Sequence, residues 1–155
     1  MAAEASTGER KQRSIADMLH LPTAPGEKPY LVGYRCQACG ATYISEGRVG
    51  CSKCTSTEPP AEIKLSDHGS LYVYSIVHQS VPGVPVPYVS AIVDLPEGVS
   101  VRCNLIDIEP DPAKIEFGMP VEMVTRTVRE RKEKNAEGVE ETIEIIAFFF
   151  KPSQN

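Results

Sequence analysis

The sequence predicts a mainly β protein in which a small metal-binding ribbon precedes a larger β domain. Two CxxC pairs lie between residues 36 and 54, and five segments after Leu65 alternate polar with β-branched or other apolar residues. No helical period of useful length interrupts these five segments. The 41% hydrophobic content supports a packed core, which excludes disorder of the whole chain.

The charge of the chain is uneven and argues against general binding of nucleic acids. The net charge is −5, and residues 59–155 carry nine basic and fifteen acidic side chains. An acidic domain repels a phosphate backbone, because such binding depends on Lys and Arg. The sequence has no apolar run of membrane-spanning length and no secretion signal at its start, so we expect a cytoplasmic protein that does not enter membranes.

Residues 1–28 are expected to form a flexible N-terminus with one short helix. Ser14 is a plausible helix cap with Asp17 at the capping-box spacing, and Pro22 stops the segment. The apolar residues at helical intervals are Ile15, Met18 and Leu19. Two readings remain open, because a two-turn helix is marginal alone: it packs on its own domain, or it docks into a groove on a partner.

Residues 29–58 are expected to form a ribbon that is held by one structural metal ion, after a β-like run at residues 30–35. The ligands are Cys36, Cys39, Cys51 and Cys54, in two CxxC knuckles separated by eleven residues. Each knuckle brings two thiolates together, and four thiolates saturate zinc, so we expect a structural site without an open position. An odd number of cysteines and two CxxC pairs favour metal over disulfides. Iron remains possible, because a rubredoxin-like site has the same ligands.

Residues 59–155 are expected to form a five-stranded barrel of the OB type. Turn residues separate the strands, and a longer connection lies between the third and the fourth, as in an OB-fold. A plain sandwich is the competing architecture. The predicted strands are 70–78, 88–95, 99–106, 121–129 and 139–150.

Alternation along the first three of these strands divides core residues from outward residues. The predicted core comprises Leu71, Val73, Val77, Val89, Ala91, Val93, Leu95, Val99, Val101, Cys103 and Leu105. Ser100, Arg102 and Asn104 then share the opposite, outward face of their strand, which in OB-type barrels often binds ligands. An ordinary solvated face is the alternative.

Three further features have both a functional and a structural interpretation. Cys103 could form a nucleophilic pair with His78 or His68 in a hydrolase, but Cys103 falls on an apolar face, where a free cysteine acts as a small hydrophobe. A module that binds single-stranded nucleic acid could use Tyr72, Tyr74 and Tyr88 to stack on bases. The acidic charge of the domain argues against this function. The charged stretch RERKEKNAEGVEE suggests a solvated ribbon protected from edge pairing, with a docking site as the alternative.

Several segments of the chain resemble a known family. They are YRCQACGATY with CSKC, then GSLYVYSIVHQSVPGVPVPYVSAIVDLPEGVSVRCNLID, FGMPVEMV and AFFFKPS, which together cover roughly residues 30–152. They are similar to bacterial and archaeal proteins with a rubredoxin-like zinc ribbon and an OB-fold that are associated with acyl-CoA enzymes, especially thiolases. Subunits of steroid side-chain aldolases and of acetoacetyl-CoA thiolase complexes share the pattern.

The resemblance implies a non-catalytic accessory subunit that forms a hetero-oligomer with a thiolase-like catalytic chain and helps to shape its acyl-CoA site. The partner would supply the catalytic residues. In such a subunit the loop at residues 81–87 and the outward residues of the barrel are expected near the CoA channel. The residues expected near CoA or the substrate are Lys53, His78, Tyr88, Arg102 and Asn104, of which Lys53 and Arg102 are chosen as phosphate contacts by their charge only. One departure concerns the second knuckle: family members often have a proline-rich turn there, whereas this chain has ISEGRVGCSKC, which keeps the ligands but alters the loop.

Overall fold

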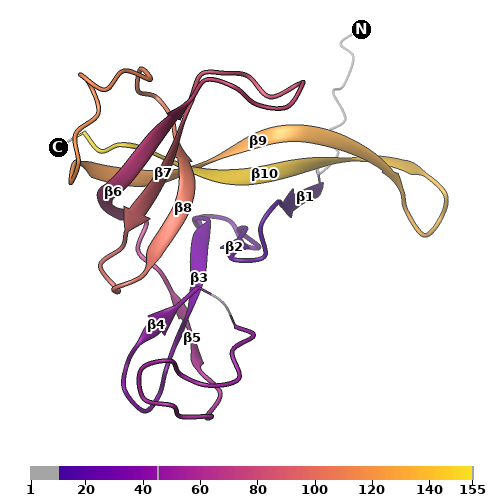
Figure 1. Cartoon of the computed structure of the whole chain (residues 1–155). Coiled ribbons are helices and arrows are strands. Elements are labelled where there is room, and N and C mark those ends of the chain that lie inside the picture. Colours follow the sequence, from indigo (N-terminus) through magenta and orange to yellow (C-terminus); the bar gives the residue numbers. More distant parts are fainter. Residues whose placement is uncertain (1–10, 45, 155) are drawn as a thin grey trace, which may run out of the picture.

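The computed structural model describes residues 11–44 and 46–154, and Figure 1 shows their arrangement. Its strands are β1 (Lys11–Ser14), β2 (Leu19–His20), β3 (Tyr30–Arg35), β4 (Thr42–Tyr43), β5 (Ala61–Lys64), β6 (His68–Val77), β7 (Tyr88–Asp94), β8 (Ser100–Leu105), β9 (Pro120–Lys134) and β10 (Glu140–Pro152). These described ranges contain no helix, and therefore none that is long and apolar enough to cross a membrane.

Strands β6 to β10 close into a barrel. β6, β7 and β8 form an antiparallel meander, and β8 pairs in parallel with β10 at Leu105 and Phe150. β9 then pairs with both β10 and β6, which leaves the sheet closed. This strand order is that of an OB-fold, so the predicted five-stranded OB-type barrel is confirmed and the plain sandwich is wrong.

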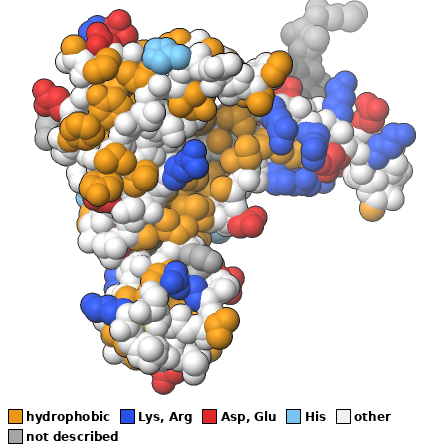
Figure 2. Space-filling view, in the orientation of Figure 1, with side chains coloured by type: hydrophobic (Ala, Val, Ile, Leu, Met, Phe, Trp, Pro, Cys, Tyr) orange, Lys and Arg blue, Asp and Glu red, His pale blue; other side chains and the backbone are white. Residues whose placement is uncertain are grey.

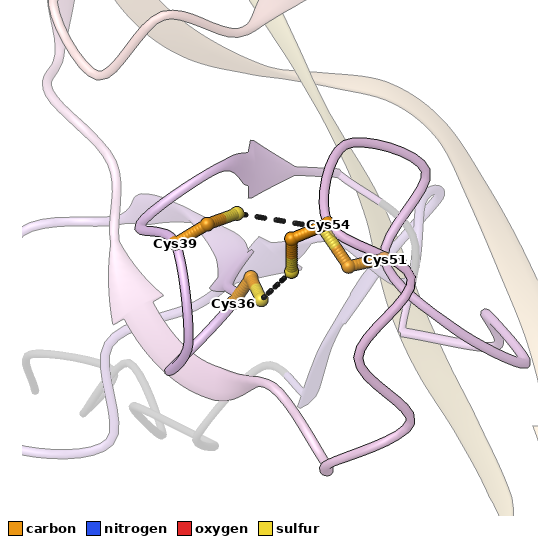
Figure 3. A group of neighbouring side chains, drawn as sticks. All are labelled: Cys36, Cys39, Cys51 and Cys54. Carbon is orange, nitrogen blue, oxygen red and sulfur yellow. Dashed lines mark hydrogen bonds between the residues drawn. The ribbon is translucent and has the colours of Figure 1, made fainter.

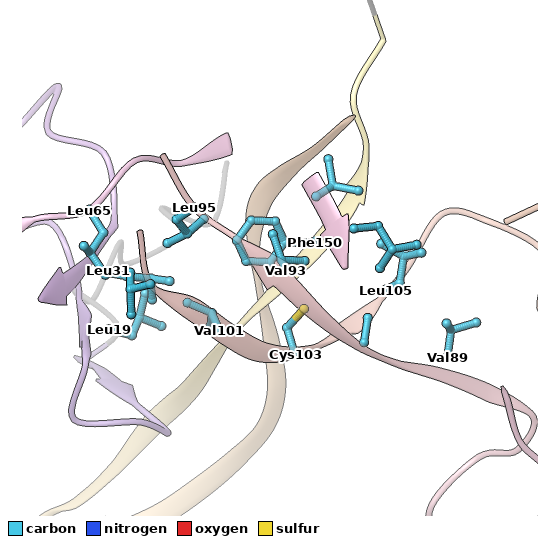
Figure 4. Packing of buried hydrophobic residues seen from close by; sticks show 14 of the residues in the cluster. Leu19, Leu31, Leu65, Val89, Val93, Leu95, Val101, Cys103, Leu105 and Phe150 are labelled. Carbon is cyan, nitrogen blue, oxygen red and sulfur yellow. The ribbon is translucent and has the colours of Figure 1, made fainter. Parts of the chain in front are cut away.

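The barrel core is aliphatic and follows the alternation of β7 and β8. Val93, Val121 and Phe150 have no exposed surface, and Figure 4 shows Phe150 against Val93 in the centre of the cluster. Cys103 lies among these core residues and is 7% exposed. All the core residues predicted on β7 and β8, and in the turn that joins them, are buried. Removal of these side chains from water is the main force that closes the barrel.

A β-bulge changes the pattern along β6. Leu71 pairs with Val93, but Val73 pairs with Ile92, so that Tyr72 is an extra residue without an opposing partner. An extra residue in one strand of an antiparallel pair bends that strand and increases its twist. Because side chains alternate with a period of two, one inserted residue also turns every later side chain of the strand to the other face.

The bulge overturns part of the predicted core. Val73 was expected to share the buried face of Leu71, yet it is 37% exposed. Val77, also expected in the core, is only half-buried at the end of β6. Tyr74 and Ile76 pack against the core in place of these two residues. The prediction for this strand was therefore wrong beyond Leu71, because a bulge leaves no mark in the polarity pattern.

The predicted helix that begins at Ser14 is also wrong. Residues 11–14 form β1, which runs parallel to β10, and the amide of Ile15 donates to the carbonyl of Ile146 at 2.8 Å. The Ser14 hydroxyl bonds to the backbone of Ala16 and so fixes a turn. The open edge of β10 offers continuous backbone pairing, which a two-turn helix cannot match in stability. The predicted flexibility of residues 1–10 falls outside the described residues.

The ribbon and the barrel meet at β3. Its first half carries Leu31 into the barrel core, where Leu31 lies beside Leu19 and Leu65 at one end of the cluster in Figure 4. A Cβ atom at Gly33 would lie 2.6 Å from a methyl carbon of Leu65, so any larger residue here would force the buried Leu65 side chain to move. Its second half pairs with β4 and β5 and leads directly to the cysteines.

Candidate metal centre and its surroundings

The two CxxC knuckles repeat one backbone arrangement. In each, the first cysteine donates its amide to the carbonyl five residues later, at 2.8 Å in both cases. Its own carbonyl accepts from the amide four residues later, at 2.9 Å after Cys36 and 2.8 Å after Cys51. The partners are Ala41 and Gly40 in the first knuckle and Ser56 and Thr55 in the second. The same pair of backbone hydrogen bonds therefore closes both turns.

The fourth residue after the first cysteine has a left-handed backbone in each knuckle. Gly40 has φ of 76° and Thr55 has φ of 61°. Glycine adopts this conformation freely, whereas a β-branched residue is strained in it. The second knuckle therefore retains a local strain that the first one lacks.

The four sulfur atoms converge on one point between the knuckles, as Figure 3 shows. The Sγ atoms of Cys36 and Cys54 are 3.6 Å apart, as are those of Cys39 and Cys51, and all four lie within 4.8 Å of one another. Ligands about 2.3 Å from a tetrahedral metal have edges of about 3.8 Å. The observed cluster could thus hold one metal ion with little movement.

The protonation of the cluster also fits a cation. The pKa of Cys51 is lowered to about 5, first because the Tyr43 hydroxyl bonds to its sulfur at 3.2 Å. For Cys54 the backbone amide of Ser56 lowers the pKa, but burial and the neighbouring sulfurs outweigh it and raise the value to about 12. Without a cation between them, four sulfurs this close cannot all be ionised, because like charges repel. A divalent cation removes that obstacle.

Tyr43 is a participant that the sequence interpretation missed. Its hydroxyl reaches both Cys51 and, at 3.0 Å, the hydroxyl of Ser52, while the guanidinium of Arg48 lies 3.9 Å from the centre of its ring. Hydrogen bonds to ligand atoms commonly orient metal ligands and tune their charge. An aromatic residue four positions after a CxxC pair was the available signal.

Cys103 does not have the properties of a nucleophile. Burial raises the pKa of its thiol to about 12, so it stays neutral near pH 7. Its strand neighbour across the ladder is Ala91, and its environment is the apolar core. His78 is exposed beyond the end of β6, outside that core. The surroundings of Cys103 therefore fit its interpretation as a small hydrophobic residue of the barrel core.

Three of the five residues that were expected near CoA, namely Tyr88, Arg102 and Asn104, share the outer surface of β6 to β8, and His78 follows the exposed end of β6. Tyr88 pairs with Val77, which immediately precedes His78, while Asn104 pairs with Ser90 and Arg102 with Ile92. Lys53 lies apart from them in the second knuckle. Arg102 separates two shallow depressions of this surface. One is lined by Val73, Ser75 and Ile92, and the other by Ile15, Asn104 and Phe148.

The three tyrosines do not form one stacking platform. Tyr72 sits in the bulge and is 60% exposed, whereas Tyr74 turns to the core and packs against Phe117, with ring centres 5.4 Å apart. Tyr88 is half-buried at the far end of β7. A row of bases could not stack on all three rings, which removes the main structural support for the nucleic-acid alternative.

The fold and the cysteine cluster together define a ribbon protein with an OB-fold barrel. A family model described as "ChsH2, C-terminal OB-fold domain" matches residues 62–126. The chain is 36% identical over 131 residues to a DUF35 domain-containing scaffold protein of Methanocaldococcus jannaschii, covering 83% of this chain and 86% of that one. The chain therefore belongs to the DUF35 family.

Two further relatives carry functional names. A benzoylsuccinyl-CoA thiolase subunit, BbsA, of Thauera aromatica is 32% identical over 117 residues, which cover 76% of this chain and 77% of that one. The solved structure of the Ltp2-ChsH2(DUF35) aldolase is similar with a TM-score of 0.53 and 28% identity, over 79% of this chain and 84% of that one. The resemblance to a family of thiolase-associated proteins is thus confirmed.

Proposed function

We propose that this protein is the non-catalytic accessory subunit of a thiolase-type enzyme that acts on acyl-CoA thioesters. The observation that carries the proposal is similarity along most of the chain to a thiolase subunit, together with similarity to the DUF35 chain of an aldolase. The properties of Cys103 agree with it, since a buried neutral thiol cannot replace the nucleophile of a thiolase. The partner chain would supply that nucleophile and the general base.

In this proposal the ribbon is a structural part of the scaffold. Cys36, Cys39, Cys51 and Cys54 would hold zinc, which would cross-link the two knuckles and leave no position for a reacting water. Iron has the same ligand requirements here, and only metal analysis separates the two. We keep residues 1–28, 29–58 and 59–155 as the working division into N-terminus, ribbon and barrel.

The outer surface of β6 to β8 is the part that we propose to lie beside the CoA site. Tyr88, Arg102 and Asn104 lie there, His78 would join them from the end of β6, and Arg102 is the cation suited to a phosphate oxygen. Lys53 would contribute only if the second knuckle also faces the partner. Among acyl-CoA substrates, 2-benzoylsuccinyl-CoA of anaerobic toluene degradation is the specific candidate, because the sequence resembles the small subunit of that thiolase and a relative has that name.

The experiment is affinity purification of this chain from its native host, followed by identification of any protein bound in stoichiometric amount. We expect a thiolase-like chain, and its thiolysis activity should fall when this chain is removed and return when it is added. Cys103→Ser should restore activity as well as the wild type does. Recovery of no thiolase-like protein, or activity of the isolated chain that Cys103→Ser abolishes, would overturn the proposal.

A further inference from the structure

A three-stranded arm extends from the barrel. β9 and β10 continue together well past the closed part, and β1 lies along the other side of β10, as Figure 1 shows. Paired side chains of adjacent strands point to the same face. Ile143 pairs with Arg131 on β9 and with Lys11 on β1, while Ile145 pairs with Arg129 and with Arg13. These residues therefore share one face, here called the basic face.

The charge of the arm differs between its two faces. The basic face carries Lys11, Arg13, Arg129 and Arg131 against Glu133 and Glu141, a net charge of 4 − 2 = +2. The opposite face carries Lys132 and Lys134 against Glu130, Glu140 and Glu144, a net charge of 2 − 3 = −1. In Figure 2 the Lys and Arg side chains of the visible surface gather most densely along the arm. A protein with a net charge of −5 thus concentrates positive charge on one side of one element.

The basic face has an apolar centre and an ordered rim. Ile143 and Ile145 are only 6% and 5% exposed, although the arm stands clear of the barrel. They lie between cationic side chains whose aliphatic stems can cover them. Both guanidinium nitrogens of Arg13 contact the Glu133 carboxylate at 3.1 Å, which stretches this side chain across the middle strand. Lys11 pairs with Glu141 at 2.5 Å and Arg131 with Glu133 at 3.6 Å, so carboxylates of the same face hold three of the four cations in place.

Protection from edge pairing does not explain this distribution. A solvated ribbon needs charges on both faces and on its open edge, with no preference of sign. Here the two faces have opposite net charge, and Arg129 forms no ion pair within the described part of the chain. Arginine side chains are enriched in protein interfaces.

We propose that the basic face of the arm docks on an acidic surface of the catalytic subunit. This inference rests on the proposed function, since the occupant is the thiolase-like chain. Arg129 and Arg131 would meet its carboxylates, with Lys11 and Arg13 at the far side of the two isoleucines. The arm would thereby anchor the complex at a distance from the outer surface of β6 to β8.

The test compares two double variants of the same strand. Arg129→Glu with Arg131→Glu reverses charge on the basic face, and Lys132→Glu with Lys134→Glu makes the same change on the opposite face. Binding to the purified catalytic subunit is measured by titration calorimetry at low and at physiological salt. We expect the first variant to weaken binding about tenfold or more at low salt, and the control by less than about threefold.

Folding and specificity are checked in the same series. Circular dichroism and metal content verify each variant, and Arg129→Gln with Arg131→Gln removes the charges without reversing them. If the wild type binds the catalytic subunit and both charge-reversal variants bind it with equal affinity, the basic face is not the docking face, although the proposed function still holds. Arginine-dependent binding to a single-stranded oligonucleotide in place of the catalytic subunit would also overturn it. A wild-type chain that binds no thiolase-like protein removes the proposed function, and this inference with it.

Discussion

The ribbon and the barrel of this chain are held together by different forces. Within residues 36–44 and 46–60, Cys36 and Cys51 are the buried side chains, so apolar burial contributes little there. In the barrel, Val93 and Phe150 are fully buried and belong to one continuous apolar cluster. A region with too small a core needs a cross-link, and four converging thiols provide the ligands for one. The comparison predicts that each region can be damaged separately.

The largest expected effect is loss of the metal from the ribbon. Cys51→Ser should reduce bound metal from about one per chain to none, because three thiolates no longer complete the tetrahedron. Emission spectrometry measures the metal, and nuclear magnetic resonance should show that signals of the ribbon collapse while those of the barrel persist. Cys103→Ser is the matched control and should keep the metal. Full retention in Cys51→Ser would show that the cluster is not the metal site.

Damage to the barrel should leave the metal in place. Phe150→Ala removes a fully buried ring and should lower the free energy of unfolding by about 3–5 kcal/mol, as measured by urea denaturation. Metal content should stay near one per chain. Phe117→Ala is the control, because this ring is 70% exposed and its loss should cost far less. Loss of metal in the folded Phe150→Ala protein would mean that ribbon and barrel are one cooperative unit.

An intermediate effect is expected at the junction of the two regions. The Glu97 carboxylate accepts hydrogen bonds from the amide and the hydroxyl of Ser66, at 2.8 and 2.6 Å, and so ties the linker to the β7–β8 turn. Glu97→Ala should cost about 1–3 kcal/mol in unfolding experiments, because the Ser66 amide loses its partner. Ser66→Ala completes a double-mutant cycle. If the losses in unfolding free energy of the two single variants simply add in the double variant, the Glu97–Ser66 interaction does not contribute to stability.

The smallest expected effect concerns the strain in the second knuckle. Thr55→Asn should stabilise the ribbon by about 0.5–1 kcal/mol, because asparagine tolerates the left-handed backbone better than a β-branched residue does. Gly40→Ala should destabilise the first knuckle by about 1 kcal/mol for the same reason. Metal-competition titrations measure both changes. Weaker metal binding by Thr55→Asn together with tighter binding by Gly40→Ala would show that backbone strain does not limit metal binding.

Much of the fold could be predicted from the sequence, because its signals were local. The cysteine spacing indicated the cluster, and alternation on β7 and β8 gave the core of those strands. The bulge at Tyr72 and the pairing of β1 with β10 depend on contacts between distant residues, so neither has a local signature. The basic face was hidden for the same reason, since Lys11 and Arg131 are far apart in the sequence.

Counting reactive thiols during chelation is the most direct test of the central claim, that four cysteines close the ribbon around a metal while the fifth belongs to the barrel core. At about pH 8 a chelator should release one metal and expose four thiols to a labelling reagent. Cys103 should stay unlabelled, because burial raises its pKa to about 12 and the reactive thiolate forms only as the pH rises toward that value. Denaturant should then expose the fifth thiol. Five thiols labelled on chelation alone, or four labelled before any metal leaves, would contradict this account.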